Sequence, residues 1–202
     1  MLKHKIQRKL HSESGVSILL ALVVLLVASF ISVTLLSASS SSVKTSSKNQ
    51  TSIQDNLTLD SACKLLKSTL NGQSYHANGS VNESSQFQIA GWDDAYKPSF
   101  PGTLAISTAV INGSSSVTSD SFTISVEGIN EIKDVTGNYA IVKTNDSEGD
   151  LYQAIYTLSL TADDNTVLKR YVTFSVAVDT ANSDTNKKVV MWTWNGVSGK
   201  EG

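Results

Sequence analysis

The sequence predicts an α+β fold in which one long N-terminal transmembrane helix extends into an amphipathic helix packed on an antiparallel β-sheet. Three observations predict this fold. A 21-residue apolar segment begins at Val16, no Gly or Pro occurs between Gly15 and Gly72, and the hydrophobic period becomes alternating after Gly72. These changes divide the chain into a basic leader, a membrane helix, a helical extension and a β-rich domain, at residues 1–15, 16–38, 39–71 and 72–202.

The first two parts predict a single-pass membrane protein. As a helix, the apolar segment Val16–Leu36 would be about 31 Å long, which is roughly the thickness of a bilayer core. Four cations precede it, at Lys3, Lys5, Arg8 and Lys9, and only Glu13 opposes them. The positive-inside rule therefore places the leader in the cytoplasm and the chain from about residue 40 outside. A cleaved signal peptide ending at Ser37-Ala38-Ser39 is the alternative, although its apolar segment usually has only ~7–15 residues.

The extension predicts a helix that covers the sheet. Its apolar residues recur at helical spacing and share one stripe: Leu59, Ala62, Cys63, Leu66 and Leu70. Ile53 and Leu57 point to another side, and Asn71-Gly72 is typical of a helix C-terminus. The weak part is 37–47, where seven of eleven residues are Ser. A flexible linker between an anchor and a separate domain is therefore the alternative.

Short alternating runs after Gly72 predict antiparallel strands joined by Asn-, Gly- and Ser-rich loops at 71–85 and 112–120. The clearest pair is Tyr152–Thr161 with Val167–Asp179, because Asp163-Asp164-Asn165 between them is typical of a turn. In the second run Arg170 shares a face with five apolar residues. The other expected strands are Phe87–Ala90, Thr103–Ile111, Ser121–Glu127, Tyr139–Lys143 and Lys188–Trp194.

The start of the apolar segment carries a family resemblance. The residues Glu13-Ser14-Gly15-Val16-Ser17-Ile18-Leu19-Leu20-Ala21-Leu22-Val23 follow a basic leader and open a long apolar helix. This arrangement resembles type IV prepilins and pseudopilins, in which a membrane peptidase cleaves after the Gly. The resemblance implies processing between Gly15 and Val16, a pilin-like fold, and a prepilin peptidase and other prepilin subunits as partners besides the membrane.

One departure from the family pattern indicates a minor subunit. Most major pilins carry Glu as the fifth mature residue, where this chain has Leu20. Within the resemblance, the chain is expected to be a minor pilin or pseudopilin of a type IV pilus, secretion or competence apparatus. Small residues could let its helix approach others closely: Ser17, Ala21, Ala28 and Ser32. Such residues are equally ordinary in any membrane helix.

The rest of the sequence predicts no enzyme, cofactor or metal site. No catalytic motif is present, the three histidines lack a zinc-ligand spacing, and a net charge of −2 gives no reason to expect nucleic-acid binding. Cys63 lies on the apolar stripe, where a buried apolar group is expected rather than a lipidated or reactive thiol. Trp192 and Trp194 share a strand face and either pack on the core or form a sugar-stacking platform.

Two further alternatives remain open from the sequence. The loop 145–150 gathers three carboxylates, which indicate either a solvated turn or a calcium site. The function is either that of an assembly subunit or that of a membrane-anchored surface-binding domain that does not assemble. An adjacent gene for a prepilin peptidase or further prepilins would distinguish these two functions.

Overall fold

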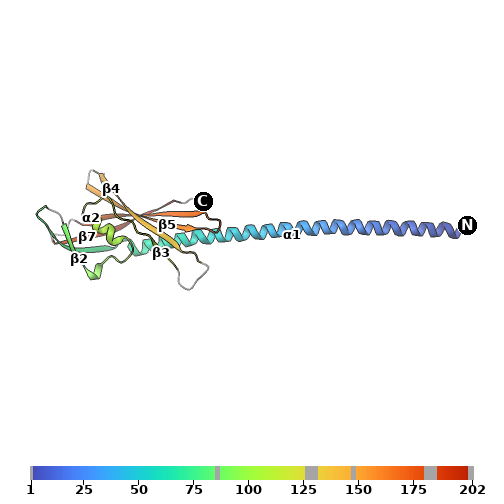
Figure 1. Cartoon of the computed structure of the whole chain (residues 1–202), viewed down its shortest axis with the longest axis horizontal. Helices are drawn as coiled ribbons and strands as arrows, with labels where there is room; N and C mark the ends of the chain where they lie inside the picture. Colours follow the sequence, from blue (N-terminus) through green and yellow to red (C-terminus); the bar gives the residue numbers. More distant parts are fainter. Residues whose placement is uncertain (1, 85–86, 126–131, 147–148, 180–185, 200–202) are drawn as a thin grey trace. The chain divides into compact units, whose positions relative to one another are not determined.

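The computed structural model describes the backbone of residues 2–84, 87–125, 132–146, 149–179 and 186–199 (Figure 1). Side chains are described for the same residues except 2–19, 145–146 and 149–150. The chain divides into two units, Met1–Thr51 and Ser52–Gly202. Helix α1 (Leu2–Leu70) makes up the described part of the first unit, and its final residues belong to the second.

The first unit is helical because nothing after Gly15 interrupts the backbone hydrogen bonds. Several of its hydroxyl side chains donate to carbonyls of the helix itself. Ser29 Oγ donates to the Leu25 carbonyl, and Ser32 Oγ donates to the Ala28 carbonyl, both at 2.8 Å. The Ser-rich stretch at 37–47 is helical too, as the expected helical extension requires, and the alternative of a flexible linker does not hold for this structure.

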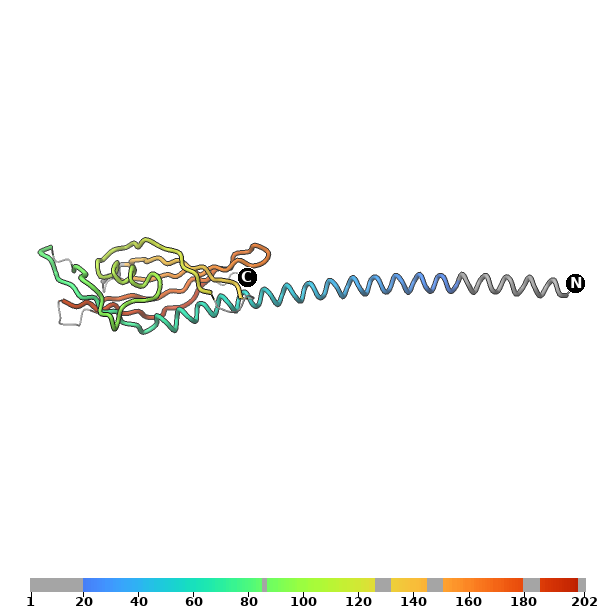
Figure 2. The backbone as a smooth tube through the Cα atoms, turned by 60° about the horizontal axis from the view of Figure 1, so that its bottom comes forward, coloured from blue at the N-terminus to red at the C-terminus, as the bar shows by residue number. Residues whose placement is uncertain are grey.

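The second unit contains one seven-stranded antiparallel sheet, in the order β2-β1-β7-β6-β5-β4-β3. Figure 1 draws strands of this sheet as arrows, and Figure 2 traces the same backbone from another side. The 3-10 helix η1 (Asp94–Tyr96) and helix α2 (Thr103–Ile111) lie between β2 and β3 in the chain. The strands are β1 (Ser74–Val81), β2 (Phe87–Trp92), β3 (Phe122–Ile124), β4 (Val135–Asp146), β5 (Gly149–Thr161), β6 (Val167–Asp179) and β7 (Lys187–Ser198).

The pairing of β5 with β6 confirms the clearest expectation from the sequence. Tyr156 faces Val172 in this pair, and the turn at 162–166 contains Asn165 with a φ of 64°. Asn tolerates this left-handed conformation better than most residues, because its short side chain can hydrogen-bond locally. Alternation in both strands then buries Tyr156, Leu158, Val172 and Phe174 on one face of the sheet.

Two expectations are wrong. Thr103–Ile111, expected as a strand, is helix α2, and the expected loop at 71–85 contains strand β1. The error at α2 arose because a short apolar run fits both periods. Its buried residues follow the helical spacing i, i+3, i+4, i+7, at Thr103, Ile106, Ser107 and Val110. The preceding Gly102, with a φ of 80°, starts the helix without a side-chain cap.

The core lies on the face of the sheet that α1 and α2 cover. It joins Leu59 and Leu66 of α1 and Ile106 of α2 to Phe174 and Trp192 of the sheet. Aromatic rings meet at its centre, where Tyr156 lies 6.2 Å from Phe174 and 6.4 Å from Trp192 between ring centroids. A long helix with its C-terminal part in the core of an antiparallel sheet is an α+β fold.

Candidate functional site

The expected processing site lies in helix α1, but its side chains are outside the described residues. Gly15 and Val16 are helical, as is Ser17, the first of the four expected helix-packing positions. The structure therefore places these residues on a continuous helical backbone and describes nothing more about them.

The apolar part of α1 exposes its side chains wherever the structure describes them. From Leu20 to Leu36 no residue is buried, including the expected packing positions Ala21, Ala28 and Ser32. Within the described residues, this is the one helix long and apolar enough to cross a membrane. Exposed leucine and valine side chains on all sides of a helix suit a lipid environment, because the transfer of apolar surface from water into lipid is favourable.

The expected helix–sheet contact residues lie in the core of the second unit. Leu59, Leu66 and Leu70 are each 0% exposed, and Ala62 and Cys63 are buried beside them. Burial, followed by the nearby Asp60 carboxylate, raises the pKa of the Cys63 thiol from 9.0 to about 11. A thiol with this pKa is protonated at neutral pH, so Cys63 acts as a small apolar group rather than a nucleophile.

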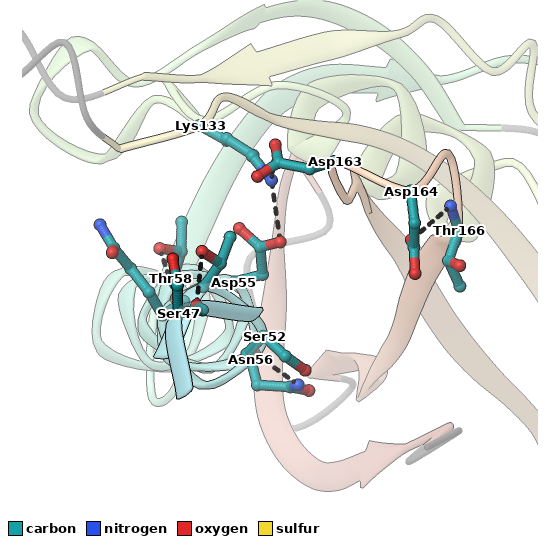
Figure 3. A network of polar contacts seen from close by, with 11 residues as sticks. Ser47, Ser52, Asp55, Asn56, Thr58, Lys133, Asp163, Asp164 and Thr166 are labelled. Atoms are coloured by element: carbon teal, nitrogen blue, oxygen red, sulfur yellow. Dashed lines mark hydrogen bonds and ion pairs between the residues drawn. The ribbon is translucent and has the colours of Figure 1, made fainter. Parts of the chain in front are cut away.

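Two cationic side chains hold the same part of α1 to the sheet, which the sequence analysis did not anticipate. The first is Lys133, whose Nζ lies 2.9 Å from the Asp55 carboxylate on α1 and 2.9 Å from that of Asp163 in the β5–β6 turn (Figure 3). Burial lowers the pKa of Lys133, but its hydrogen bonds to Asp163 and Asp55 outweigh that effect and raise it overall. Asp55, only 4% exposed, thus has a cation to balance its charge.

The second cation, Arg170 on β6, is 3% exposed. Its Nε donates to Asp60 Oδ1 at 3.2 Å, and its Nη2 donates to Asn56 Oδ1 at 2.9 Å. Its Nη1 donates to the carbonyls of Lys169 and Gly199, both at 3.1 Å. A buried guanidinium would be very unfavourable without such partners.

These contacts form a polar clamp, by which we mean Asp55, Asn56 and Asp60 of α1 together with Lys133 and Arg170. About one and a half turns of α1 supply the three acceptor side chains, and the two cations come from segments that are far from α1 in the sequence. The sequence did carry one signal, because the alternation of β6 placed Arg170 on the buried face. No comparable signal identified Lys133, which precedes β4 and reaches α1 only through the tertiary fold.

Beside the clamp, α1 and the β3–β4 edge border an apolar groove of about 310 Å³. Leu57 and Leu65 stand on its rim and are exposed, whereas Ala62 and Val135 are buried in its floor. Ile124 and Ile132 complete the sheet side. Thr58, Ser61 and Lys133 supply the polar side chains of its lining.

The tryptophan pair packs on the core, so the sugar-platform alternative is wrong. Trp192 is 0% exposed, and its Nε1 donates to Ser107 Oγ of α2 at 3.2 Å. Trp194 packs against Phe174 at 5.4 Å between centroids, and Lys67 Nζ lies 5.1 Å from its ring centroid. Because Trp192 is fully buried, the two indoles do not form an exposed pair.

The described residues contain no group of three or more His, Cys, Asp or Glu side chains that could hold a metal ion. The carboxylates of 145–150, weighed above as a calcium site, lie outside the described side chains. The described part of the chain offers an apolar helix, a helix–sheet core and a polar clamp. Comparisons with protein families, curated proteins and solved structures find no match to this chain.

Proposed function

We propose that this chain is a minor pilin- or pseudopilin-like structural subunit of a type IV pilus or a related secretion or competence apparatus. Gly15 immediately before the apolar helix is the observation that carries the proposal, because the peptidase of the family cleaves after a Gly in this position. A small residue fits a protease pocket that a larger side chain would block. The N-terminus lies in the cytoplasm and the sheet domain outside, as the leader charges favour.

Continuity of α1 with the core supports the proposal. Residues 20–36 expose only uncharged side chains, while residues from Asp55 to Leu70 are held by the clamp and the apolar stripe. A subunit anchored in this way carries its domain along when its helix is drawn out of a membrane into a filament.

Leu20 supports the minor role. A Glu at this position would need a cationic partner from another subunit, because an ionised carboxylate in an apolar helix is costly. The exposed Leu20 needs none, so the chain can end a filament but lacks the registering contact of a bulk subunit. It therefore joins partner prepilins that carry the acid and does not polymerise alone.

Mass spectrometry of the mature N-terminus tests the processing step. The chain is coexpressed with an active prepilin peptidase, and in parallel with a catalytically inactive one. We expect a mature chain that starts at Val16 with the active enzyme only, and Gly15→Leu should block this cleavage. An intact Met1 beside the active enzyme, or a start at Ser39 or Ser40, would show that the proposal is wrong.

Crosslinking from membranes, with quantification against the major subunit, tests the minor role. We expect the chain at low abundance and crosslinked to prepilins that carry the acid. Recovery as the most abundant subunit of a sheared filament would overturn the minor assignment. Cleavage without any prepilin partner would favour the membrane-anchored surface-binding domain.

A further inference from the structure

The apolar groove beside the clamp lies where the sheet ends. Strand β3 is the last strand in the sheet order, and no described strand pairs with its outer side. Ile124 of β3 lines the groove from the sheet, and Leu57 and Leu65 line it from α1. The outer side of an edge strand presents backbone N–H and C=O groups that can pair with another extended chain. The groove is therefore bordered by apolar side chains of a helix and by the backbone of an edge strand.

Apolar side chains around the groove are only partly covered. Phe122 and Ile124 of β3 pack against the core but are half-buried. On α1, Leu57 is 61% exposed and Leu65 is 46% exposed. A strand added beside β3 would direct every second side chain to the same side of the sheet as Ile124, because strand side chains alternate between the two faces. Those side chains would enter the groove and bury apolar surface, which is favourable.

The size of the groove favours one extended segment over a helix or a folded surface. The groove has a volume of about 310 Å³ and nine described lining residues. Two turns of helix, about 10 Å across and about 11 Å long, would fill roughly 850 Å³. A stable complex of folded proteins uses about 20–30 residues on each side. An extended segment needs less room, because only its alternate side chains enter the groove.

The charges around the groove favour an uncharged segment. Lys133 is the one charged residue among the described lining residues, and the carboxylates of Asp55 and Asp163 each lie 2.9 Å from its Nζ. Because this cation already has two anionic partners, the groove has no unbalanced positive charge to attract an acidic ligand.

The backbone at the β3 edge favours a peptide over an acyl chain. An acyl chain would suit the apolar lining, but it would cover the edge without forming hydrogen bonds, which is costly. A peptide backbone supplies those hydrogen bonds. We propose that the groove and the β3 edge together bind an extended segment of a partner protein that carries aliphatic side chains at alternate positions. This interaction goes beyond the proposed assembly role, because it needs only the second unit and not the cleavage at Gly15.

Selection from a random peptide library displayed on phage tests the kind of occupant. The full-length chain is held in lipid nanodiscs, and phage that bind empty nanodiscs are removed first. We expect enriched peptides whose aliphatic residues recur at every second position, which is the period of a strand. Enrichment of aliphatic residues at every third or fourth position, the period of a helix, would overturn the proposal, and so would the absence of enrichment.

Backbone methylation of the best enriched peptide tests the strand pairing. Two versions are made, each with methyl groups on alternate backbone nitrogens, so that one version loses the N–H donors that face β3 and the other loses those that face away. Both versions keep every side chain. By fluorescence anisotropy we expect one version to bind at least tenfold more weakly than the other, the loss of about two hydrogen bonds. Equal affinity of the two versions would overturn pairing with the edge and would assign the groove to an apolar ligand such as an acyl chain.

Leu57→Lys and Ile53→Lys form a matched pair of variants. Both positions are exposed on α1, at 61% and 62%, but only Leu57 lines the groove. Leu57→Lys should weaken peptide binding about tenfold, because it replaces apolar contact with a charge that needs hydration. Ile53→Lys should bind as the unmodified chain does, and equal urea midpoints for the two variants would show that both are folded. Equal peptide affinity of the two folded variants would overturn the assignment to this groove.

Discussion

Replacing Leu66 with Ala should destabilise the second unit far more than the same change at the neighbouring Leu65. Leu66 is 0% exposed and lies in the core with Leu59 and Leu70, whereas Leu65 is 46% exposed on the rim of the groove. Both positions belong to the same helix, so the change in helix propensity is the same and cancels between the two variants.

The expected magnitude follows from burial. Leu66→Ala removes three carbon atoms from the core, which is about 2.4 kcal/mol at ~0.8 kcal/mol per buried CH₂. The cavity left behind adds to this loss, and buried Leu→Ala changes cost roughly 2–5 kcal/mol in total. Leu65→Ala loses only partial burial and leaves no enclosed cavity, so its cost should stay below about 1 kcal/mol.

Urea unfolding of the full-length chain in a mild detergent, followed by tryptophan fluorescence, measures the two costs. The fluorescence reports the second unit, because all three tryptophans lie in its sheet strands. The denaturant slope should be unchanged, so that the midpoint shift gives the change in unfolding free energy. Equal costs at the two positions, or a cost at Leu66 within about 0.5 kcal/mol, would refute the packing of this stripe.

Two further predictions concern the polar clamp and the thiol. Arg170→Ala should lower the unfolding free energy by roughly 1–3 kcal/mol in the same assay, because it leaves Asn56 Oδ1 and the Gly199 carbonyl without their donor. The side chain of Asp60 is 47% exposed, so water can hydrate its carboxylate after the change. The control Lys169→Ala, at the exposed adjacent position, should cost less than about 0.5 kcal/mol. The Cys63 thiol should resist Ellman's reagent at pH 8 until urea unfolds the second unit, and rapid labelling of the native chain would contradict its burial. The unfolding free energy should fall as the pH rises from 9.0 toward about 11, because the thiol ionises at lower pH in the unfolded chain than in the folded one.

Much of the fold could be predicted from the helical and strand periodicity of the apolar residues. The stripe from Leu59 to Leu70 and the pairing of β5 with β6 were readable because each has a long run with one clear period. Helix α2 was missed because nine residues fit either period, and β1 was missed because Asn78 and Gly79 resemble a loop. The bulge between Asn78 and Gly79 explains these residues, since Gly79 allows close approach of Phe87 and Gln88.

The Lys133 contact of the clamp was beyond sequence reasoning for a different reason. Asp55 and Lys133 are separated by 78 positions, and their pairing depends on how the helix and the strands meet. Local pattern predicts elements, whereas sites assembled from several elements require the tertiary fold.

The strand order has a consequence for the timing of folding. Strand β1, which follows α1 directly, pairs with the last strand β7 and places Ser74 opposite Met191. The end of the helix depends on the same partner, because Gly72 N donates to the Trp192 carbonyl and Trp192 N donates to that of Gln73. A ribosome must therefore synthesise the chain as far as β7 before β1 acquires this neighbour. Such a domain folds late and as a unit, and chains truncated before β7 should be degraded rather than accumulate half-folded.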